Sequence, residues 1–262
     1  MHLSVDNPGS NVLVANYSSG TIEVIPMDAD GTLRPPTTMI QHTGRGGTPQ
    51  RPSSPRAHGI YPDVSGKYAL VPDLGLDKVF IYSLDSTKGT LAQDNVPFGA
   101  VPAGHGPRQL AFSRDNRFVY CINELGNSVT VFGWSPETPA LTALQTLSTL
   151  PSDFTNRSTA AQIVLHPNGK FLYASNRGHD SIAIFAVDAK TGLLTAQGHV
   201  PTGGKVPRNI NIDPTGHWLL AGHQNTALVA TFKVDGETGQ LTPLDQKIEI
   251  AAAICVIFVP VE

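Results

Sequence analysis

A pattern of short apolar strands separated by tight turns recurs five times in this sequence, at intervals of about fifty residues. The clearest copy begins at Gln162. Its first two strands flank the turn Pro167-Asn168-Gly169, its third strand covers residues 181–187, and a fourth follows at 193–196. Proline presets the backbone of such turns, and glycine tolerates their positive-φ position. Four strands connected this closely predict an antiparallel meander in which each strand pairs with the next.

The residue that ends the second strand of each copy defines the period. These residues are Asn16, Asp73, Asn123, Asn176 and His223, so that successive copies are 57, 50, 53 and 47 residues apart. A period near fifty with four strands per repeat is typical of a β-propeller blade. We therefore predict an all-β propeller of four-stranded antiparallel blades, in preference to a β-sandwich or a β-helix. The predicted blades are approximately 2–55, 56–107, 108–160, 161–207 and 208–252.

The end of the sequence predicts one more strand. Residues 253–260 are mostly apolar, and no further strand pattern follows them. We expect an orphan closing strand that belongs to a blade of a larger propeller, with a closed ring of five blades as the alternative. An unpaired apolar edge invites pairing with another chain. The strand is therefore a candidate contact between molecules, and the oligomeric state is left open.

Composition excludes several classes of function. The formal net charge is −3, only 15% of residues are charged, and no basic stripe is present, so we expect no nucleic-acid partner. The longest apolar run, residues 250–261, is too short to span a bilayer. The first residues lack a signal-peptide pattern, and we expect a cytoplasmic protein. The nine histidines are scattered, so neither a metal site nor a cofactor is predicted. Cys121 and Cys255 are expected to be buried.

Strand direction predicts where the chemistry lies. In an antiparallel meander the first and third strands start at the same end of the blade, so the segment before strand one and the loop after strand two share a face. Pro-Arg dipeptides precede three first strands, ending at Arg56, Arg108 and Arg208. Guanidinium groups bind carboxylate or phosphate in a bidentate manner, which favours an anionic ligand on this face. The alternative is a structural role for the dipeptide as a rigid turn. The side chains expected to converge on this rim are Arg56, His58, Arg108, Glu124, Arg177 and Arg208.

Three segments of the sequence resemble a known family. They are PRAHGIYPDVSGKYALVPDLGLDKVFIYSLD, GPRQLAFSRDNRFVYCINELGNSVTVF and HPNGKFLYASNRGHDSIAIF, at residues 55–85, 106–132 and 166–185. They are similar to the lactonase family with a seven-bladed propeller, which includes propeller-type 6-phosphogluconolactonases and a 3-carboxy-cis,cis-muconate lactonizing enzyme. The resemblance covers nearly the whole chain and implies that about two blades of N-terminal sequence are absent. It implies catalytic roles for His58, Arg108, Glu124 and Arg177. One departure is Gln109, where the family often has His.

The function implied is hydrolysis of a phosphorylated sugar lactone by direct attack of water, as in the pentose phosphate pathway of glucose metabolism. Glu124 is expected to act as general base. His58 is expected to donate a proton or orient the water, and Arg108 and Arg177 to bind phosphate and stabilise the oxyanion. Two alternatives stay open, namely cyclisation of a carboxymuconate at the same site and a non-catalytic binding scaffold. Further substrate-binding residues are predicted at Arg56, Asp73, Asn176, His179, Arg208 and Gln224.

Overall fold

The computed structural model describes residues 2–49, 51–92 and 97–259, and in these residues it contains strands and turns but no helix. The first sheet comprises β1 (His2–Val5), β2 (Asn11–Asn16), β3 (Thr21–Pro26) and β4 (Thr38–Gln41). The second comprises β7 (Tyr61–Pro62), β8 (Tyr68–Asp73), β9 (Lys78–Asp85) and β10 (Thr90–Leu91), with β11 (Phe98–Ala100) also paired to β9. The third comprises β12 (Pro107–Phe112), β13 (Phe118–Asn123), β14 (Ser128–Ser135) and β15 (Ala140–Ser148).

The fourth sheet comprises β16 (Thr159–Leu165), β17 (Phe171–Arg177), β18 (Ser181–Val187) and β19 (Leu194–Pro201). The fifth comprises β20 (Pro207–Ile212), β21 (Trp218–His223), β22 (Val229–Val234) and β23 (Leu241–Ile248). A separate hairpin joins β5 (Gly46–Thr48) to β6 (Arg51–Ser53). All pairings between consecutive strands of a sheet are antiparallel. The predicted all-β propeller of four-stranded meanders is therefore confirmed.

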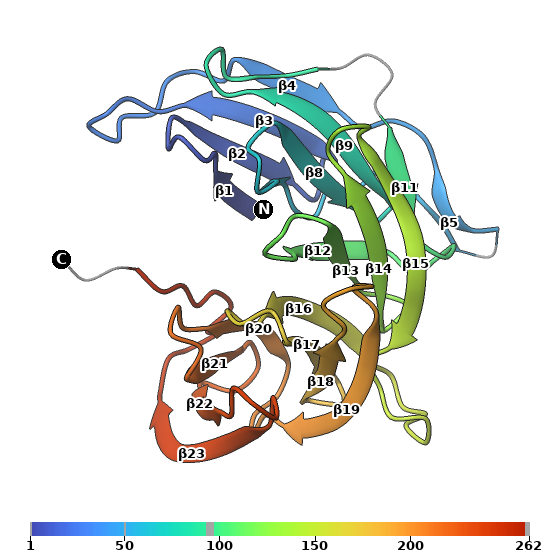
Figure 1. The fold of residues 1–262 in the computed structure, drawn as a ribbon, viewed down its shortest axis with the longest axis vertical. Coiled ribbons are helices and arrows are strands. Elements are labelled where there is room, and N and C mark those ends of the chain that lie inside the picture. The colour runs from blue at the N-terminus through green and yellow to red at the C-terminus, as the bar shows by residue number, and fades with distance from the viewer. Residues whose placement is uncertain (1, 50, 93–96, 260–262) are drawn as a thin grey trace.

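The sheets follow one another around an arc (Figure 1), with the first strand of each sheet on the inside and the fourth on the outside. Neighbouring first strands touch, because β12 contacts β16 and β16 contacts β20. The segments that precede these first strands are therefore brought together at the centre of the arc, even though they are about fifty residues apart in sequence.

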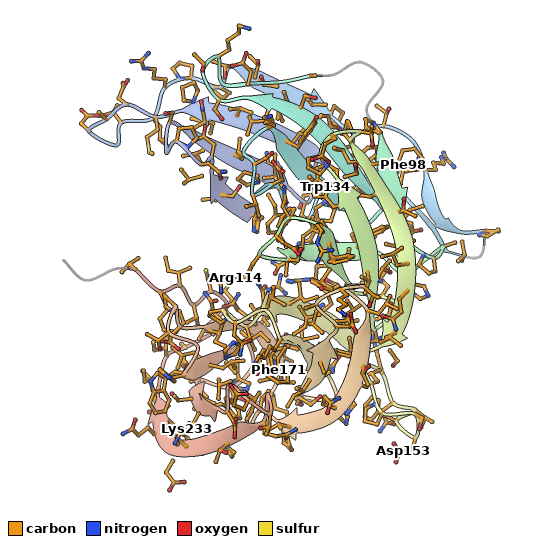
Figure 2. The ribbon with its side chains drawn as sticks, in the orientation of Figure 1. Phe98, Arg114, Trp134, Asp153, Phe171 and Lys233 are labelled. Atoms are coloured by element: carbon orange, nitrogen blue, oxygen red, sulfur yellow. The ribbon has the colours of Figure 1, made fainter. Side chains whose placement is uncertain are left out.

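The hydrophobic core lies between neighbouring sheets rather than within one. Four apolar clusters fill the four successive interfaces, and each combines residues from two adjacent sheets. Trp134 and Phe171 belong to two of these clusters, whereas Lys233 projects to the solvent (Figure 2). Each fully buried side chain of leucine or phenylalanine size contributes about 1.5–3 kcal/mol. Along the central strands, successive side chains point to opposite faces of the sheet. The second, third and fourth sheets therefore each contribute apolar side chains to two clusters.

The segment predicted as a closing strand does not form a strand in its described part, residues 253–259. The Val256 amide donates to the Asn209 side chain at 2.9 Å, and the Val256 carbonyl accepts from the Asn211 side chain at 3.0 Å. Since side chains satisfy these backbone groups, the segment lies beside β20 without a backbone ladder. Residue 260 lies outside the described residues. Cys255 is consequently exposed, so its predicted burial was wrong, while Cys121 is buried and both thiols are free.

Candidate active site

Four side chains from three neighbouring sheets meet at one carboxylate oxygen. Arg108 Nε lies 2.9 Å from Glu124 Oε2, and Arg177 Nη2 lies 3.0 Å from the same oxygen. His58 Nε2 lies 3.9 Å from it. The structure thus brings together the four residues for which catalytic roles were predicted, and we call this group the Glu124 cluster. Their roles remain predictions.

The backbone around Glu124 explains why the cluster forms. Its amide donates to the Gly106 carbonyl at 2.8 Å, on the approach to β12 of the same sheet. Its carbonyl accepts from the Ala160 amide at 3.0 Å, at the start of the next sheet. Arg177 Nη2 donates to the Ala160 carbonyl at 3.0 Å, and Arg108 Nη1 donates to the Ala161 carbonyl. Two adjacent sheets are therefore joined at the point where both guanidinium groups reach the acid.

Burial and charge set the protonation states in the cluster. Burial, reinforced by the Arg108 charge, holds the pKa of His58 well below its ordinary value. Burial also lowers the pKa of Arg108 to about 10, against the opposing effect of Glu124. At neutral pH the imidazole is therefore neutral and the guanidinium charged. Nδ1 of His58 is buried and has no hydrogen-bond partner among the described residues.

The register of the first strands differs from the one suggested by the Pro-Arg dipeptides. Pairing with the end of the second strand aligns Ala57 with Pro107 and Pro207, because these residues lie opposite Asp73, Asn123 and His223, respectively. His58 therefore occupies the position of Arg108 and Arg208, and Arg56 lies two residues earlier. The ladder is irregular between 107 and 109 and between 207 and 209, and such bulges re-aim side chains. Arg56 and Arg108 share the Pro-Arg dipeptide but are not equivalent in register, because hydrogen bonding between strands, not the dipeptide, sets the register.

Arg56 and Arg208 lie outside the Glu124 cluster. Arg56 Nη1 donates to the Ser18 carbonyl at 2.8 Å, and its guanidinium carbon lies 5.4 Å from the centre of the Tyr17 ring. Arg208 Nη1 donates to Gln224 Oε1 at 3.2 Å. The charge of Arg208 nevertheless lowers the pKa values of both His58 and Arg108, after burial and nearer charges. Arg208 and Gln224 thus face the same region from the last sheet.

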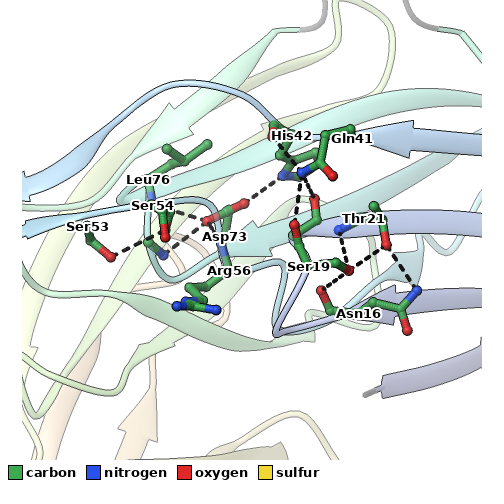
Figure 3. Close-up of polar contacts among 12 residues, drawn as sticks. Asn16, Ser19, Thr21, Gln41, His42, Ser53, Ser54, Arg56, Asp73 and Leu76 are labelled. Carbon is green, nitrogen blue, oxygen red and sulfur yellow. Dashed lines mark hydrogen bonds and ion pairs between the residues drawn. The ribbon is translucent and has the colours of Figure 1, made fainter.

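Asp73 is fully buried and holds its own loop together. Its Oδ1 accepts from the backbone amides of Arg56, Gly75 and Leu76 at 2.7, 3.0 and 3.1 Å. Its Oδ2 lies 2.6 Å from His42 Nδ1 (Figure 3). With both oxygens engaged, the predicted substrate contact of Asp73 is not supported by this placement.

Asn176 is similarly enclosed. It donates to the Thr149 carbonyl and accepts from the Thr149 hydroxyl, both at 2.7 Å. His179 Nδ1 lies 2.6 Å from Ser181 Oγ, and its ring packs edge-on against Phe154. His179 lines a separate open depression with Asp180 and Lys205. Neither Asn176 nor His179 joins the Glu124 cluster.

Sequence reasoning missed Tyr17. Its ring lies 5.2 Å from that of His58, centroid to centroid, in an edge-on arrangement. Tyr17 directly follows Asn16, as Glu124 follows Asn123 and Arg177 follows Asn176. The same position after strand two therefore supplies three residues of this face, and that spacing was the available signal. A metal site is not indicated, because the described residues include no group of three or more His, Cys, Asp or Glu that could hold an ion.

Fold and cluster together define a propeller whose central face carries an acid, an imidazole and two guanidinium groups. A family model described as "Lactonase, 7-bladed beta-propeller" matches residues 1–258. The chain belongs to this family, and the resemblance predicted from the sequence is confirmed.

Curated relatives are similar over most of the chain. The 6-phosphogluconolactonase of Bacillus subtilis (strain 168) is 36% identical over 214 residues, which cover 81% of this chain and 59% of the relative. The 6-phosphogluconolactonase of Pectobacterium carotovorum is 35% identical over 212 residues, covering 81% of this chain and 60% of the relative. The chain therefore spans about 60% of the length of these relatives.

Solved structures show the same architecture. The periplasmic gluconolactonase PpgL of Pseudomonas aeruginosa superposes with a TM-score of 0.91 at 33% identity, over 100% of this chain and 73% of that one. A putative 6-phosphogluconolactonase from Bacteroides fragilis gives 0.89 at 34% identity, over 98% and 72%. Within the described residues, no helix has the length and apolar character needed to cross a membrane.

Proposed function

We propose that this chain hydrolyses a phosphorylated sugar lactone at the Glu124 cluster, in the manner suggested by the names of its relatives. The observation that carries the proposal is that a neutral imidazole and two guanidinium groups converge on one carboxylate oxygen, Oε2 of Glu124. Lactone opening requires a base to activate water, a cation to stabilise the oxyanion, and an acid for the leaving oxygen. The cluster contains a group for each task.

The geometry favours His58 as the base. His58 Nε2 and Glu124 Oε2 are 3.9 Å apart, so a water placed about 2 Å to the side of the line joining them would hydrogen-bond to both at about 2.8 Å. A neutral imidazole can accept the proton of that water as its oxygen attacks the lactone carbonyl. Glu124 then orients the water and stabilises the imidazolium that forms, while it is itself held by Arg108 and Arg177. This division of labour reverses the roles expected from the sequence, where Glu124 was the base.

The later steps follow from the same groups. Attack by water produces a tetrahedral oxyanion, and Arg177 is the better placed cation because its side chain is 12% exposed, against 3% for Arg108. Collapse of this intermediate breaks the bond between the carbonyl carbon and the ring oxygen. The imidazolium of His58 returns its proton to that oxygen. The products are a carboxylic acid and a free hydroxyl, and no covalent enzyme intermediate is required.

A phosphorylated substrate also suggests a location and a metabolic context. Sugar phosphates carry a charge that keeps them inside the cell, so we place the activity in the cytoplasm and in the oxidative branch of glucose metabolism. PpgL, the periplasmic relative, is by its title a gluconolactonase. Recognition of phosphate is therefore the property that distinguishes a 6-phosphogluconolactonase from a gluconolactonase.

The test is acid release from 6-phosphoglucono-δ-lactone, followed with a pH indicator, using the full chain. We expect a rate well above spontaneous hydrolysis, and a loss of at least 100-fold in Glu124→Gln and Arg177→Gln. Glu237→Gln is the matched control, because Glu237 is exposed and, within the part of the chain that the structure describes, forms an ion pair with Lys170 far from the cluster. A wild-type rate equal to the spontaneous rate would overturn the proposal. Ultraviolet absorbance loss with 3-carboxymuconate in place of lactone hydrolysis would assign the site to cyclisation.

A further inference from the structure

A cavity of about 260 Å³ lies beside the Glu124 cluster, and we call it the Arg56 cavity. Its walls come from the β5–β6 hairpin, from the loops after β2, β8 and β13, and from the loop before β12. The chain next to it is closely packed, since a Cβ on Gly75 would lie 1.7 Å from the Ser54 carbonyl oxygen. The lining residues on which the argument depends are Tyr17, Gly47, Arg56, Asp77, Gly104 and Leu125.

Tyr17 and Leu125 connect this cavity to the Glu124 cluster. Tyr17 lines the cavity and carries Arg56 over its ring, while its edge-on contact with His58 reaches the cluster. Leu125 lines the cavity and directly follows Glu124 in the chain. Tyr17 and Leu125 therefore border both the cavity and the cluster.

The cation available to a ligand in this cavity is Arg56. Asp77 is the acid among the lining residues, but its oxygens accept the amides of Gly47, Gly104 and Gly106 at 2.8–2.9 Å. Three donors disperse the charge of this carboxylate and leave it as a structural anchor. Arg56, by contrast, donates a side-chain hydrogen bond to the Ser18 carbonyl and forms no ion pair among the described residues. An arginine on an aromatic ring in a partly apolar cavity suits a phosphate group.

The two arginines of the Glu124 cluster are poor candidates for this task. Arg108 is almost fully buried and donates to Glu124 and to the Ala161 carbonyl. Arg177 donates to the Ala160 carbonyl and pairs with Glu124. Protein groups engage donors of both side chains, and Arg177 is assigned to the oxyanion, so a permanent anionic group of the substrate needs another cation.

We propose that the Arg56 cavity binds the phosphate of the substrate while the lactone ring lies at His58 and Glu124. This inference rests on the proposed lactone hydrolysis and adds to it the element that distinguishes phosphorylated from unphosphorylated lactones. Arg56 is then a specificity-determining residue, and Tyr17 positions its guanidinium group.

The experiment compares 6-phosphoglucono-δ-lactone with glucono-δ-lactone in the full chain. Arg56→Gln should raise KM for the phosphorylated lactone by roughly 10- to 100-fold, the effect of losing a charge-assisted contact. KM for glucono-δ-lactone should stay within about twofold, and kcat should change little for both substrates. Arg56→Lys should restore part of the lost affinity. Arg114→Gln, an exposed residue of the β12–β13 turn, is the control for removal of one positive charge.

Arg208→Gln tests the alternative that Arg208, which faces the Glu124 cluster from the fifth sheet, binds the phosphate. If Arg208→Gln, and not Arg56→Gln, raises KM for the phosphorylated lactone selectively, the assignment to the Arg56 cavity is wrong. Equal effects of Arg56→Gln on both lactones overturn it as well. If the wild type hydrolyses neither lactone, the proposed function fails. Binding of 6-phosphogluconate, measured by calorimetry, would then test the cavity on its own. Binding by the wild type that is lost only in Arg56→Gln would support phosphate binding in the cavity, and binding retained in Arg56→Gln would refute it.

Discussion

Replacing Glu124 by Gln removes the negative charge shared by Arg108 and Arg177. At an effective dielectric constant of about 20, each contact near 3 Å corresponds to about 5 kcal/mol of attraction. Desolvation of the three groups offsets much of this, and breaking a buried pair typically costs about 3–5 kcal/mol. Glu124 is 17% exposed, and the Gln amide oxygen can still accept a hydrogen bond. We therefore expect a loss of about 3 kcal/mol, which lowers Tm by roughly 6–12 °C.

Thermal unfolding of the wild type, Glu124→Gln and Glu237→Gln at pH 7 measures this effect. Glu237 and Lys170 are 84% and 54% exposed, so the control should lose less than about 0.5 kcal/mol. The double variant Glu124→Gln/Arg177→Gln should recover part of the lost stability, because one of two repelling guanidinium groups is then absent. A Tm for Glu124→Gln equal to that of the control would mean that this carboxylate does not compensate the two arginines, and the electrostatic reasoning would be refuted.

Three further predictions concern protonation and buried polar contacts. The acid limb of kcat/KM should have its midpoint below about 6.5, because burial lowers the pKa of His58, and a midpoint above 6.5 would exclude a neutral base. Burial lowers the pKa of His2 to about 4, so the unfolded chain binds this proton first as pH falls. The free energy of unfolding should therefore fall by roughly 3 kcal/mol between pH 6.5 and pH 4. Denaturant unfolding of His2→Phe should show a smaller fall over the same range. Asn176→Ala should cost about 1–3 kcal/mol because the Thr149 hydroxyl loses its acceptor and the Thr149 carbonyl loses one donor, while KM stays constant; a raised KM with unchanged stability would restore a ligand role.

The repeat and its spacing could be read from the sequence because they reflect local chemistry. The polar residue at the end of each second strand was found in all five copies. In the structure, Asn123 donates to Ser128 and Thr130, and Asn176 donates to Ser181, so this position connects the second strand to the start of the third. Its recurrence is thus a property of the blade. Asp73 and Asn176 were assigned to the substrate because a shared face was taken as sufficient evidence, although burial removes their side chains from it.

The shared face was also correctly predicted for the Glu124 cluster. Strand direction depends only on the alternation of strands along the chain, which turn residues and apolar runs reveal. Register depends on hydrogen bonds between strands, and a single bulge shifts it without any sign in composition. Alignment of the Pro-Arg dipeptides alone would therefore place Arg56 opposite Arg108, whereas the structure gives that position to His58.

Charge pairing was the part that sequence could least supply. A face rich in arginine suggests several free cations for an anionic ligand, but Glu124 and three backbone carbonyls engage Arg108 and Arg177. Two guanidinium groups around one carboxylate still leave a net positive charge, which suits an oxyanion formed next to His58. They do not leave a site for a second, permanent anion. If the substrate carries a phosphate, we assign its recognition to an arginine outside the cluster. Of the two on this face, Arg56 is the one that lines a cavity, and Tyr17 of that cavity contacts His58.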